Sequence, residues 1–210
     1  MIFMHEILRF AETAYIENQH LMPLLADYAN PYDFITRLVK RGDLIRLKNG
    51  FFVIAEKIQK SPVPYHQIGN LLYGPSYLSF EWALSYYNMI PEGVYVITST
   101  SATKSRSYTT PLGTFDYHYL NHQRYTVGMD QQKNFAGNFL IATPEKALAD
   151  LIHFKSKNLE SSKDMLIDLI EARRIEESLL KSLNKDHLLE IAERYRSEPV
   201  TQLINALGLL

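Results

Sequence analysis

Basic residues are concentrated in one stretch of the chain, where they could neutralise phosphate groups. Residues 30 to 60 contain seven basic and three acidic residues, a local excess of four positive charges, whereas the whole chain has a formal net charge of -1. The basic residues are Arg37, Lys40, Arg41, Arg46, Lys48, Lys57 and Lys60. A positive segment on an otherwise neutral protein is typical of a module that binds the nucleic-acid backbone.

Residue patterns typical of catalysis or metal binding are not found elsewhere in the sequence. There is no cysteine, which excludes disulfides, thiolate metal sites and a cysteine nucleophile. Seven histidines are present, but no pair combines the i,i+4 spacing of a helical zinc site with a neighbouring glutamate. The glycine-rich phosphate-binding loops and the G-x-S-x-G nucleophile motif are also missing. The sequence therefore predicts a protein that is not an enzyme and needs neither metal nor cofactor.

Glu145 and Lys146 are the one pair that hints at an enzyme, a metal-dependent nuclease, because they follow a short apolar run. Such an enzyme needs a further carboxylate on an adjacent strand to hold the metal, and none is evident. Glu145 fits better as a first-turn residue whose charge complements a helix dipole. The nuclease hypothesis stays open as a minor alternative.

The basic residues fall on two expected elements, and the first is a helix that begins at Pro31. Asn30 is expected to cap this helix, with Pro31 at the first helical position and Gly42 as the left-handed residue after its end. At helical spacing, an apolar stripe forms from Phe34, Ile35, Leu38 and Val39. The opposite side carries Tyr32, Asp33, Thr36, Arg37 and Lys40.

The second element is a β-hairpin that turns at Asn49 and Gly50, a strong signal for a two-residue type I′ turn. Such a turn places four apolar side chains on one face of the hairpin, in the cross-strand pairs Leu47–Phe52 and Ile45–Ile54. Arg46 and Lys48 are then expected on the other face.

A basic amphipathic helix followed at once by a hairpin is typical of the DNA-reading half of a winged helix-turn-helix. The helix would enter a groove, while the hairpin would contact adjacent phosphates or the minor groove. The expected DNA-binding residues are Tyr32, Thr36, Arg37, Lys40, Arg46, Lys48 and Asn49. Two alternatives stay open: a charged surface helix with no binding role, and a winged helix that binds protein instead of DNA.

The rest of the chain indicates an α+β protein with two domains, at residues 1–60 and 61–210. Helices are expected over residues 2–17 and 21–29, followed by a linker at Ser61–Pro64. Strands are expected at 93–98, 111–120 and 139–141, a polar loop at 99–107, and helices at 143–154 and from 162 onward. The expected fold is an N-terminal winged helix-turn-helix followed by a mixed α/β domain with a helical C-terminus.

The sequence also bears on where the protein acts. No apolar run approaches the roughly 20 residues of a membrane-spanning helix. The first ten residues lack the charged start and small-residue cleavage site of a signal peptide. We therefore expect a cytoplasmic protein without a membrane partner.

Four blocks of sequence, in order over most of residues 30–155, resemble one protein family. They are LVKRGDLIRLKNGFFVI (38–54), LLYGPSYLSFEWALSYYNMIPE (71–92), TSTSATKSRSYTTPLGTFDYHYL (98–120) and ATPEKALADLIHF (142–154). These blocks are similar to the AbiEi-type antitoxins of type IV toxin–antitoxin systems, which act in abortive infection.

The resemblance implies two activities. The winged helix would bind inverted repeats in double-stranded DNA at the promoter of its own operon and repress it. The remainder would counteract a nucleotidyltransferase-like toxin. The resemblance places the DNA contacts on Thr36, Arg37, Lys40, Arg46 and Lys48, and it assigns no toxin-neutralising residue. The alternative is a stand-alone regulator or interaction module without a toxin partner.

Overall fold

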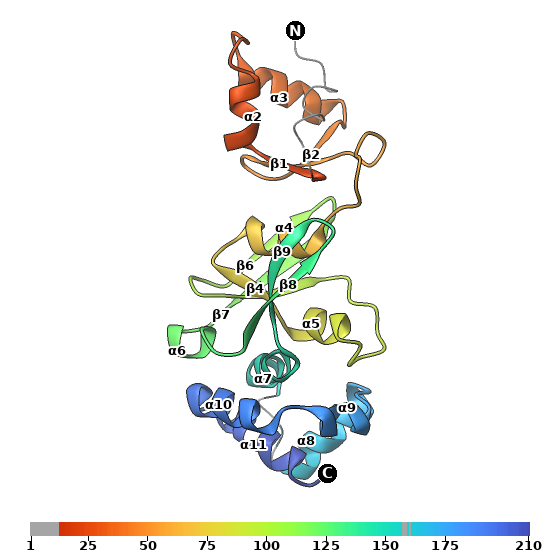
Figure 1. The fold of residues 1–210 in the computed structure, drawn as a ribbon, viewed down its shortest axis with the longest axis vertical. Coiled ribbons are helices and arrows are strands. Elements are labelled where there is room, and N and C mark those ends of the chain that lie inside the picture. The colour runs from red at the N-terminus through yellow and green to blue at the C-terminus, as the bar shows by residue number, and fades with distance from the viewer. Residues whose placement is uncertain (1–12, 157–158, 160) are drawn as a thin grey trace.

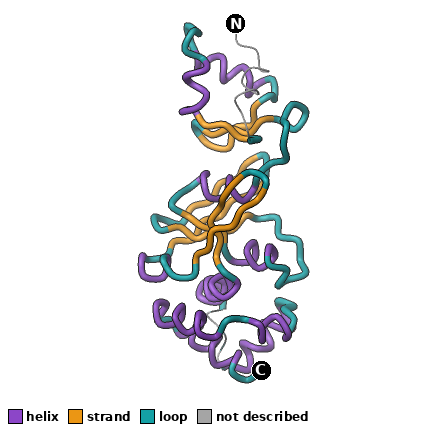
Figure 2. The backbone as a smooth tube through the Cα atoms, in the orientation of Figure 1, coloured by secondary structure: helices purple, strands orange, loops and turns teal. Residues whose placement is uncertain are grey.

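The computed structural model describes residues 13–156, 159 and 161–210, which form three tiers along one long axis (Figure 1). A small unit of helices and short strands forms the first tier, and a six-stranded sheet with its covering helices forms the second. The C-terminal helices form the third tier, at the opposite end of the molecule (Figure 2). The expected mixture of helices and sheets is confirmed.

The first tier contains two helices packed on one face of a three-stranded antiparallel sheet. The sheet has the order β1-β3-β2. Its elements are β1 (Tyr15–Glu17), α2 (Asn18–Leu24), α3 (Pro31–Lys40), β2 (Leu44–Lys48) and β3 (Phe51–Ile54). A small apolar core lies between helices and sheet, formed by Ile16, Leu21, Leu25, Ile35, Leu38, Leu44, Phe52 and Ile54.

The prediction of a helix over residues 2–17 is wrong for residues 15–17, and residues 2–12 lie outside the described part of the chain. Residues 15–17 form β1, which pairs with β3. Pairing with β3 satisfies the backbone hydrogen-bonding groups of this segment and outweighs its helical spacing of apolar residues. The second helix also differs from expectation, because it spans residues 18–24 rather than 21–29. It ends early in a turn, where the amides of Leu25 and Ala26 bond three residues back.

The expected caps of α3 are confirmed. The Asn30 side chain accepts a hydrogen bond from the amide of Asp33 at 3.3 Å, and Pro31 opens the helix. Gly42 has a φ of +70°, and its amide donates to the carbonyl of Val39 at 3.0 Å. A glycine in this conformation ends a helix without the steric penalty of a side chain. Residues at or next to its two ends therefore determine where α3 begins and ends.

The hairpin turn lies at the expected position, but its type and the strand register differ from the prediction. Gly50 has a φ of +76°, whereas Asn49 does not have the positive φ that a type I′ turn needs at both central residues. Asn49 and Gly50 form the turn between the paired residues Lys48 and Phe51. A β-bulge at Leu47 then shifts every pair beyond it by one residue, which gives the pairs Arg46–Phe52, Ile45–Val53 and Leu44–Ile54. The predicted pairs of Leu47 with Phe52 and Ile45 with Ile54 are therefore wrong.

The register differs because both faces of this small sheet are buried, whereas the sequence pattern assumed one apolar face. Phe52 and Ile54 face the core beneath the helices. Leu47, Phe51 and Val53 instead join the large core of the second tier. A bulge re-aims side chains, and here it places Arg46 opposite Phe52 and Lys48 opposite Phe51, on different faces of the sheet.

The second tier is built on a mixed sheet with the strand order β6-β7-β5-β4-β9-β8. Its strands are β4 (Ser76–Leu78), β5 (Ile97–Ser101), β6 (Arg106–Thr110), β7 (Gly113–Tyr119), β8 (Met129–Asn134) and β9 (Gly137–Ala142). The pairs β4–β9 and β5–β7 are parallel, and the other pairs are antiparallel. The helices of this tier are α4 (Tyr65–Leu72), α5 (Phe80–Tyr86), α6 (His122–Tyr125) and α7 (Pro144–Lys155). Residues 55–64, which include the expected linker, join β3 to α4 without a helix or strand.

Several strand predictions in this tier need correction. The strand expected at 93–98 is wrong, because β5 begins at Ile97 and Tyr95 is 91% exposed. The polar run 99–107 is not one loop, since residues 99–101 are buried in β5 and residues 106–107 start β6. Two of the three buried hydroxyl groups have partners within the protein: Thr100 Oγ1 donates to the Asp150 carboxylate at 3.2 Å, and Ser101 Oγ lies 3.0 Å from Thr103 Oγ1. The polar residues 99–101 therefore lie in the central strand β5 and not in the expected loop.

The remaining expectations for this part of the chain come closer. The segment 111–120 contains β7, which begins at Gly113, and the segment 139–141 lies inside β9, whose partner β8 was not predicted. The helix expected at 143–154 is confirmed as α7, and Thr143 caps it by accepting from the amide of Lys146 at 3.3 Å.

The third tier is helical from residue 162, as expected. It contains α8 (Ser162–Ile167), the π-helical turn η1 (Asp168–Ala172), α9 (Glu177–Ser182), α10 (Lys185–Tyr195) and α11 (Glu198–Leu207). Of these, α10 and α11 pack against α7, while α8 packs against α11. The apolar residues of this tier join the same core as the sheet. None of the helices in the described ranges is long and apolar enough to cross a membrane.

Candidate nucleic-acid interface

The outer face of α3 is polar and exposed. Ile35 and Leu38 are buried beneath the helix, whereas Thr36, Arg37 and Lys40 point away from the core and are exposed. Tyr32 is 61% exposed, which is unusual for an aromatic side chain of this size. The division of the helix into an apolar back and a polar front is therefore confirmed.

Contacts along this face order several of its side chains. Thr36 Oγ1 donates to the carbonyl of Tyr32 at 2.8 Å. The guanidinium carbon of Arg37 lies 5.8 Å from the centroid of the Phe34 ring. Asn30 Nδ2 donates to the Asp33 carboxylate at 2.8 Å, so the acid at the start of the helix is held by its own cap.

Two cations of this face have no acidic partner in the described part of the chain. Arg37 and Lys40 form no ion pair there, whereas Arg41 and Lys57 both pair with Asp43, at 2.8 Å and 3.1 Å. Within the described residues, the charges of Arg37 and Lys40 are therefore not neutralised by a carboxylate, as a site for an external anion requires. The backbone of a nucleic acid is one such anion.

Arg46 lies on the same side of the small sheet as the helices. Cross-strand partners in an antiparallel pair point to the same face, and the partner of Arg46 is Phe52, which belongs to the core beneath the helices. Its guanidinium carbon is 5.6 Å from the Phe52 ring centroid, and the side chain is exposed. The bulge at Leu47 thus brings Arg46 to the side that carries α3, which contacts β2.

Lys48 lies on the opposite side and is engaged at the junction with the second tier. Its Nζ donates to the carbonyls of Leu72 at 2.6 Å and Leu71 at 3.3 Å, which are the last residues of α4. An ammonium group at these carbonyls satisfies acceptors that a helix end leaves unpaired. Burial lowers the pKa of Lys48, and nearby Glu17 partly opposes this shift.

The hairpin does not project as a free arm. Asn49 is exposed at its tip, but the neighbouring carbonyl of Gly50 accepts a hydrogen bond from the amide of Asn18 at 2.8 Å. The ring of Phe51 stacks on that of Tyr15 with 5.5 Å between centroids, on the face that meets the second tier. The structure therefore groups Arg46 with the residues of α3, and it places Lys48 away from them.

A second group of charged residues is fully buried around Asp150 of α7, and the sequence patterns did not reveal it. Asp150 accepts hydrogen bonds from five side chains on four separate segments. Ser79 Oγ donates at 2.5 Å, while Tyr77 and Thr100 donate at 3.2 Å. Lys146 Nζ lies 3.3 Å from the carboxylate, and the Tyr195 hydroxyl also donates to it.

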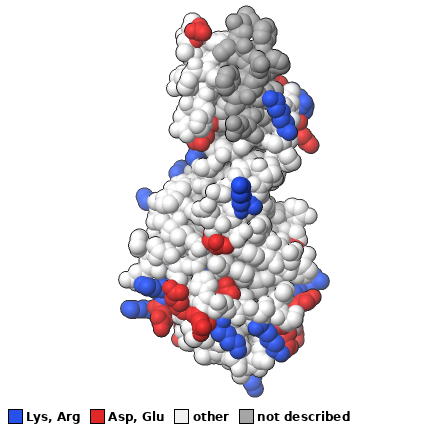
Figure 3. Space-filling model, in the orientation of Figure 1, with Lys and Arg blue, Asp and Glu red and all other residues white. Residues whose placement is uncertain are grey.

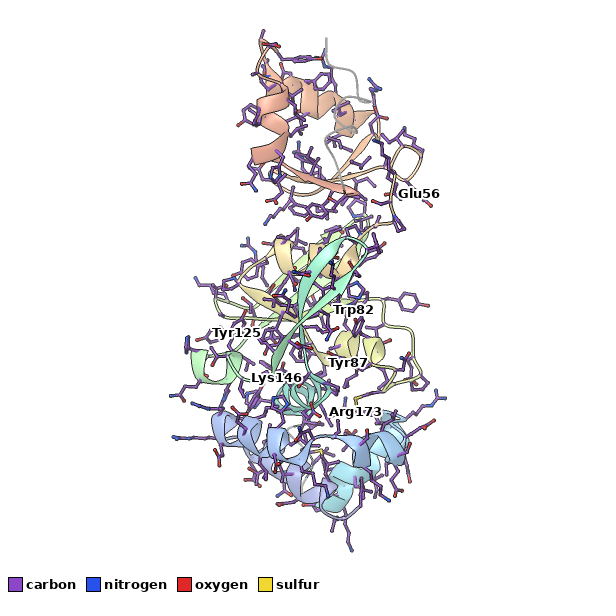
Figure 4. All side chains as sticks on the ribbon, viewed as in Figure 1. Glu56, Trp82, Tyr87, Tyr125, Lys146 and Arg173 are labelled. Atoms are coloured by element: carbon purple, nitrogen blue, oxygen red, sulfur yellow. The ribbon has the colours of Figure 1, made fainter. Side chains whose placement is uncertain are left out.

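This group connects the sheet to the third tier. Lys146 Nζ donates to the Tyr195 hydroxyl at 2.5 Å and to the carbonyl of Arg124 at 2.6 Å. Figure 4 shows Lys146 on α7, between the sheet and the C-terminal helices. Burial raises the pKa of Tyr195 and lowers that of Lys146, although Asp150 opposes the shift of Lys146. The side chains of Lys146 and Asp150 are both completely buried. A Lys and an Asp four residues apart in an apolar helix were the available sequence signal.

The nuclease hypothesis finds no open carboxylate at Glu145. Its Oε1 accepts from the amide of Asn184 at 2.8 Å, and its Oε2 lies 3.5 Å from His187 Nδ1. Glu145 therefore ties the start of α7 to the start of α10. Within residues 13–156, 159 and 161–210, no cluster of three or more acidic or histidine residues could hold a metal ion.

A hollow of about 650 Å³ lies on the second tier, beside α5 and α7. Its lining includes Glu81, Thr98, Asp116, His118, Leu151 and Lys155. Lys155 Nζ pairs with Glu81 at 2.6 Å, and burial lowers the pKa of His118, with the nearby Lys155 charge acting in the same direction. The lining of the hollow combines charged side chains with apolar ones.

The surface charges of the third tier differ from those of α3. Figure 3 shows acidic and basic side chains mixed over the C-terminal helices at the bottom of the view. Such mixed charges repel and attract a polyanion about equally.

In comparisons with known proteins, the chain matches no protein-family model and no curated protein.

Proposed function

We propose that the first tier is a winged helix-turn-helix that binds double-stranded DNA. Support comes from the element order β1-α2-α3-β2-β3, in which two helices precede a hairpin and pack on one face of its sheet. In this arrangement α3 is the recognition helix and enters the major groove, while the hairpin lies beside it.

One observation carries this proposal. The exposed residues Thr36, Arg37 and Lys40 stand on the outer face of a helix with ordered ends, and Arg46 stands on the same side of the sheet. Arginine and lysine can donate to guanine edges or phosphates, and a hydroxyl can contact either. Tyr32, near the start of α3, extends the same surface.

In this proposal the wing is the β2–β3 hairpin, and it contacts DNA through Arg46 rather than through Lys48. Lys48 is hydrogen-bonded to the end of α4, and the hairpin face that carries Phe51 and Val53 packs on the second tier. Fixing the hairpin in this way orders Arg46 before DNA arrives, which lowers the entropic cost of binding. Asn49 at the tip remains an exposed candidate for a backbone contact.

We further propose that the protein acts by binding and not by catalysis, as a cytoplasmic antitoxin that represses its own promoter. The similarity of residues 38–54, 71–92, 98–120 and 142–154 to AbiEi-type antitoxins supports this assignment. Under it, the operator consists of inverted repeats upstream of its own gene, and the second and third tiers counteract a nucleotidyltransferase-like toxin. The occupied state of Glu145 and the burial of Lys146 favour this role over that of a nuclease.

The experiment is a titration of the purified protein with its own upstream DNA and with a scrambled duplex, at two salt concentrations. We expect tighter binding to the upstream DNA, with an affinity that falls steeply as salt rises, because phosphate neutralisation releases counterions. Equal affinity for both duplexes would refute an operator. Binding of a protein partner with little dependence on salt, together with no binding to DNA, would identify an interaction module instead.

A further inference from the structure

A second pair of exposed cations lies across the junction from Arg46. Lys104 and Arg106 stand on the turn and strand that follow β5, and both are exposed. β6, which contains Arg106, is an edge strand of the large sheet, and it contacts β2, the edge strand that contains Arg46. Figure 3 shows basic side chains at the narrow waist between the first two tiers. The two edges therefore bring cations of both tiers to one region.

Arg106 is held in an orientation that suits an anion. Its guanidinium carbon lies 5.2 Å from the ring centroid of Tyr108 and 5.7 Å from that of Tyr73. A guanidinium group stacked on aromatic faces keeps its N–H donors free in its own plane, where they match two phosphate oxygens. In the described part of the chain, neither Arg106 nor Lys104 has an acidic partner within ion-pair distance.

The turn that carries these cations is fixed by its own hydrogen bonds. The amide of Thr103 donates to Ser101 Oγ at 3.2 Å, and Thr103 Oγ1 donates to the Tyr73 hydroxyl at 2.8 Å. The amide of Tyr119 donates to Ser105 Oγ at 3.0 Å. Little conformational entropy is then lost when an anion binds, in contrast to a flexible loop with the same charges.

The junction itself is shared by the two tiers. Lys48 spans it, bonded to α4, and the positive charge of Arg106 adds to burial in lowering the pKa of Lys48. Lys48 therefore holds the two tiers together at the junction, and Arg46, Lys104 and Arg106 are exposed to solvent.

We propose that Lys104 and Arg106 bind the phosphate backbone of the DNA that flanks the segment read by α3. This inference rests on the proposed function of the first tier, and it makes the second tier part of the DNA-binding surface. The ligand is the sugar–phosphate backbone, so the contact adds affinity and salt dependence without adding sequence preference.

The test compares two duplexes and two pairs of substitutions. The short duplex is trimmed to the site protected by the first tier, and the long duplex extends that site by about one helical turn, roughly 10 base pairs, on each side. The test variant is Lys104→Ala with Arg106→Ala. The control is Lys133→Ala with Lys163→Ala, which removes the same charge from exposed positions on the opposite edge strand β8 and on α8.

We expect the test variant to bind the long duplex about tenfold more weakly than the unchanged protein, with a salt slope reduced by about two. Its affinity for the short duplex and the behaviour of the control variant should be unchanged. Equal loss on both duplexes, or no loss on the long duplex, would overturn the flanking contact while leaving binding by α3 intact. Failure of the unchanged protein to bind either duplex would overturn both proposals. Thermal unfolding of each variant confirms that it is folded.

Discussion

The helices α3 and α7 begin with the same local signals but place their charges in opposite environments. Each has a capping side chain followed by proline, Asn30–Pro31 in one and Thr143–Pro144 in the other. On α3, Arg37 is exposed and has no acidic partner in the described residues, whereas on α7 Lys146 is completely buried beside Asp150. Similar starts therefore do not imply similar roles.

Under the proposed function, this difference separates charge that binds an external phosphate from charge that stabilises the fold. A cation in water without a carboxylate can neutralise an external phosphate at little cost to stability. A buried cation must have its partners supplied by the protein, because an unpaired charge in the interior is strongly unfavourable. Substitutions on α7 should therefore change the free energy of unfolding, and substitutions on α3 should change the affinity for DNA.

The largest expected effect is that of Asp150→Asn on stability. This change removes the charge that balances Lys146 and weakens the acceptor shared by four hydroxyl groups. Breaking a buried ion pair by altering one partner typically costs about 3–5 kcal/mol. Chemical denaturation should therefore show a large fall in the free energy of unfolding. Asp186→Asn, at an exposed site on α10, should change it by no more than about 0.5 kcal/mol. Equal effects would mean that the buried network contributes nothing.

A smaller effect is expected for Lys48→Met, which keeps the aliphatic chain but removes the ammonium group. The carbonyls of Leu71 and Leu72 would lose their donor at the junction, at a cost of about 1 kcal/mol in the free energy of unfolding. DNA affinity should fall less than in Arg46→Met, because only Arg46 lies on the side of the sheet that carries α3. A greater loss of affinity in Lys48→Met would place Lys48 in the DNA contact and contradict the comparison.

The sequence predicted local features of the fold well because their determinants are neighbouring residues. Asn30, Gly42 and the Asn49–Gly50 turn were all identified, since caps and tight turns depend on backbone geometry that few residue types satisfy. The amphipathic character of α3 followed from its spacing of apolar residues.

Features that depend on distant parts of the chain could not be predicted in this way. The second tier buries the face of the hairpin that carries Leu47, Phe51 and Val53, and no pattern within residues 44–54 shows that burial or the bulge at Leu47. The polar residues 99–101 indicated a loop, but Ser99 and Thr100 are buried in the strand β5. In the structure, the partner of Thr100 is Asp150, fifty residues along the chain.

The candidate site was predicted in part for the same reason. The exposure of Arg37 and Lys40 followed from the periodicity of one helix, so the sequence was sufficient. The separation of Arg46 from Lys48 depended on the bulge, and the cations Lys104 and Arg106 entered the region only through contact between two edge strands.

The most direct test of the central claim is the effect of Arg37→Ala with Lys40→Ala on binding to the upstream DNA. Both side chains face away from the core, so the free energy of unfolding should change by no more than about 0.5 kcal/mol. Operator affinity should fall at least about tenfold and the salt slope by up to about two. A stable variant that binds the operator with unchanged affinity and salt dependence would contradict the assignment of α3 as the recognition helix.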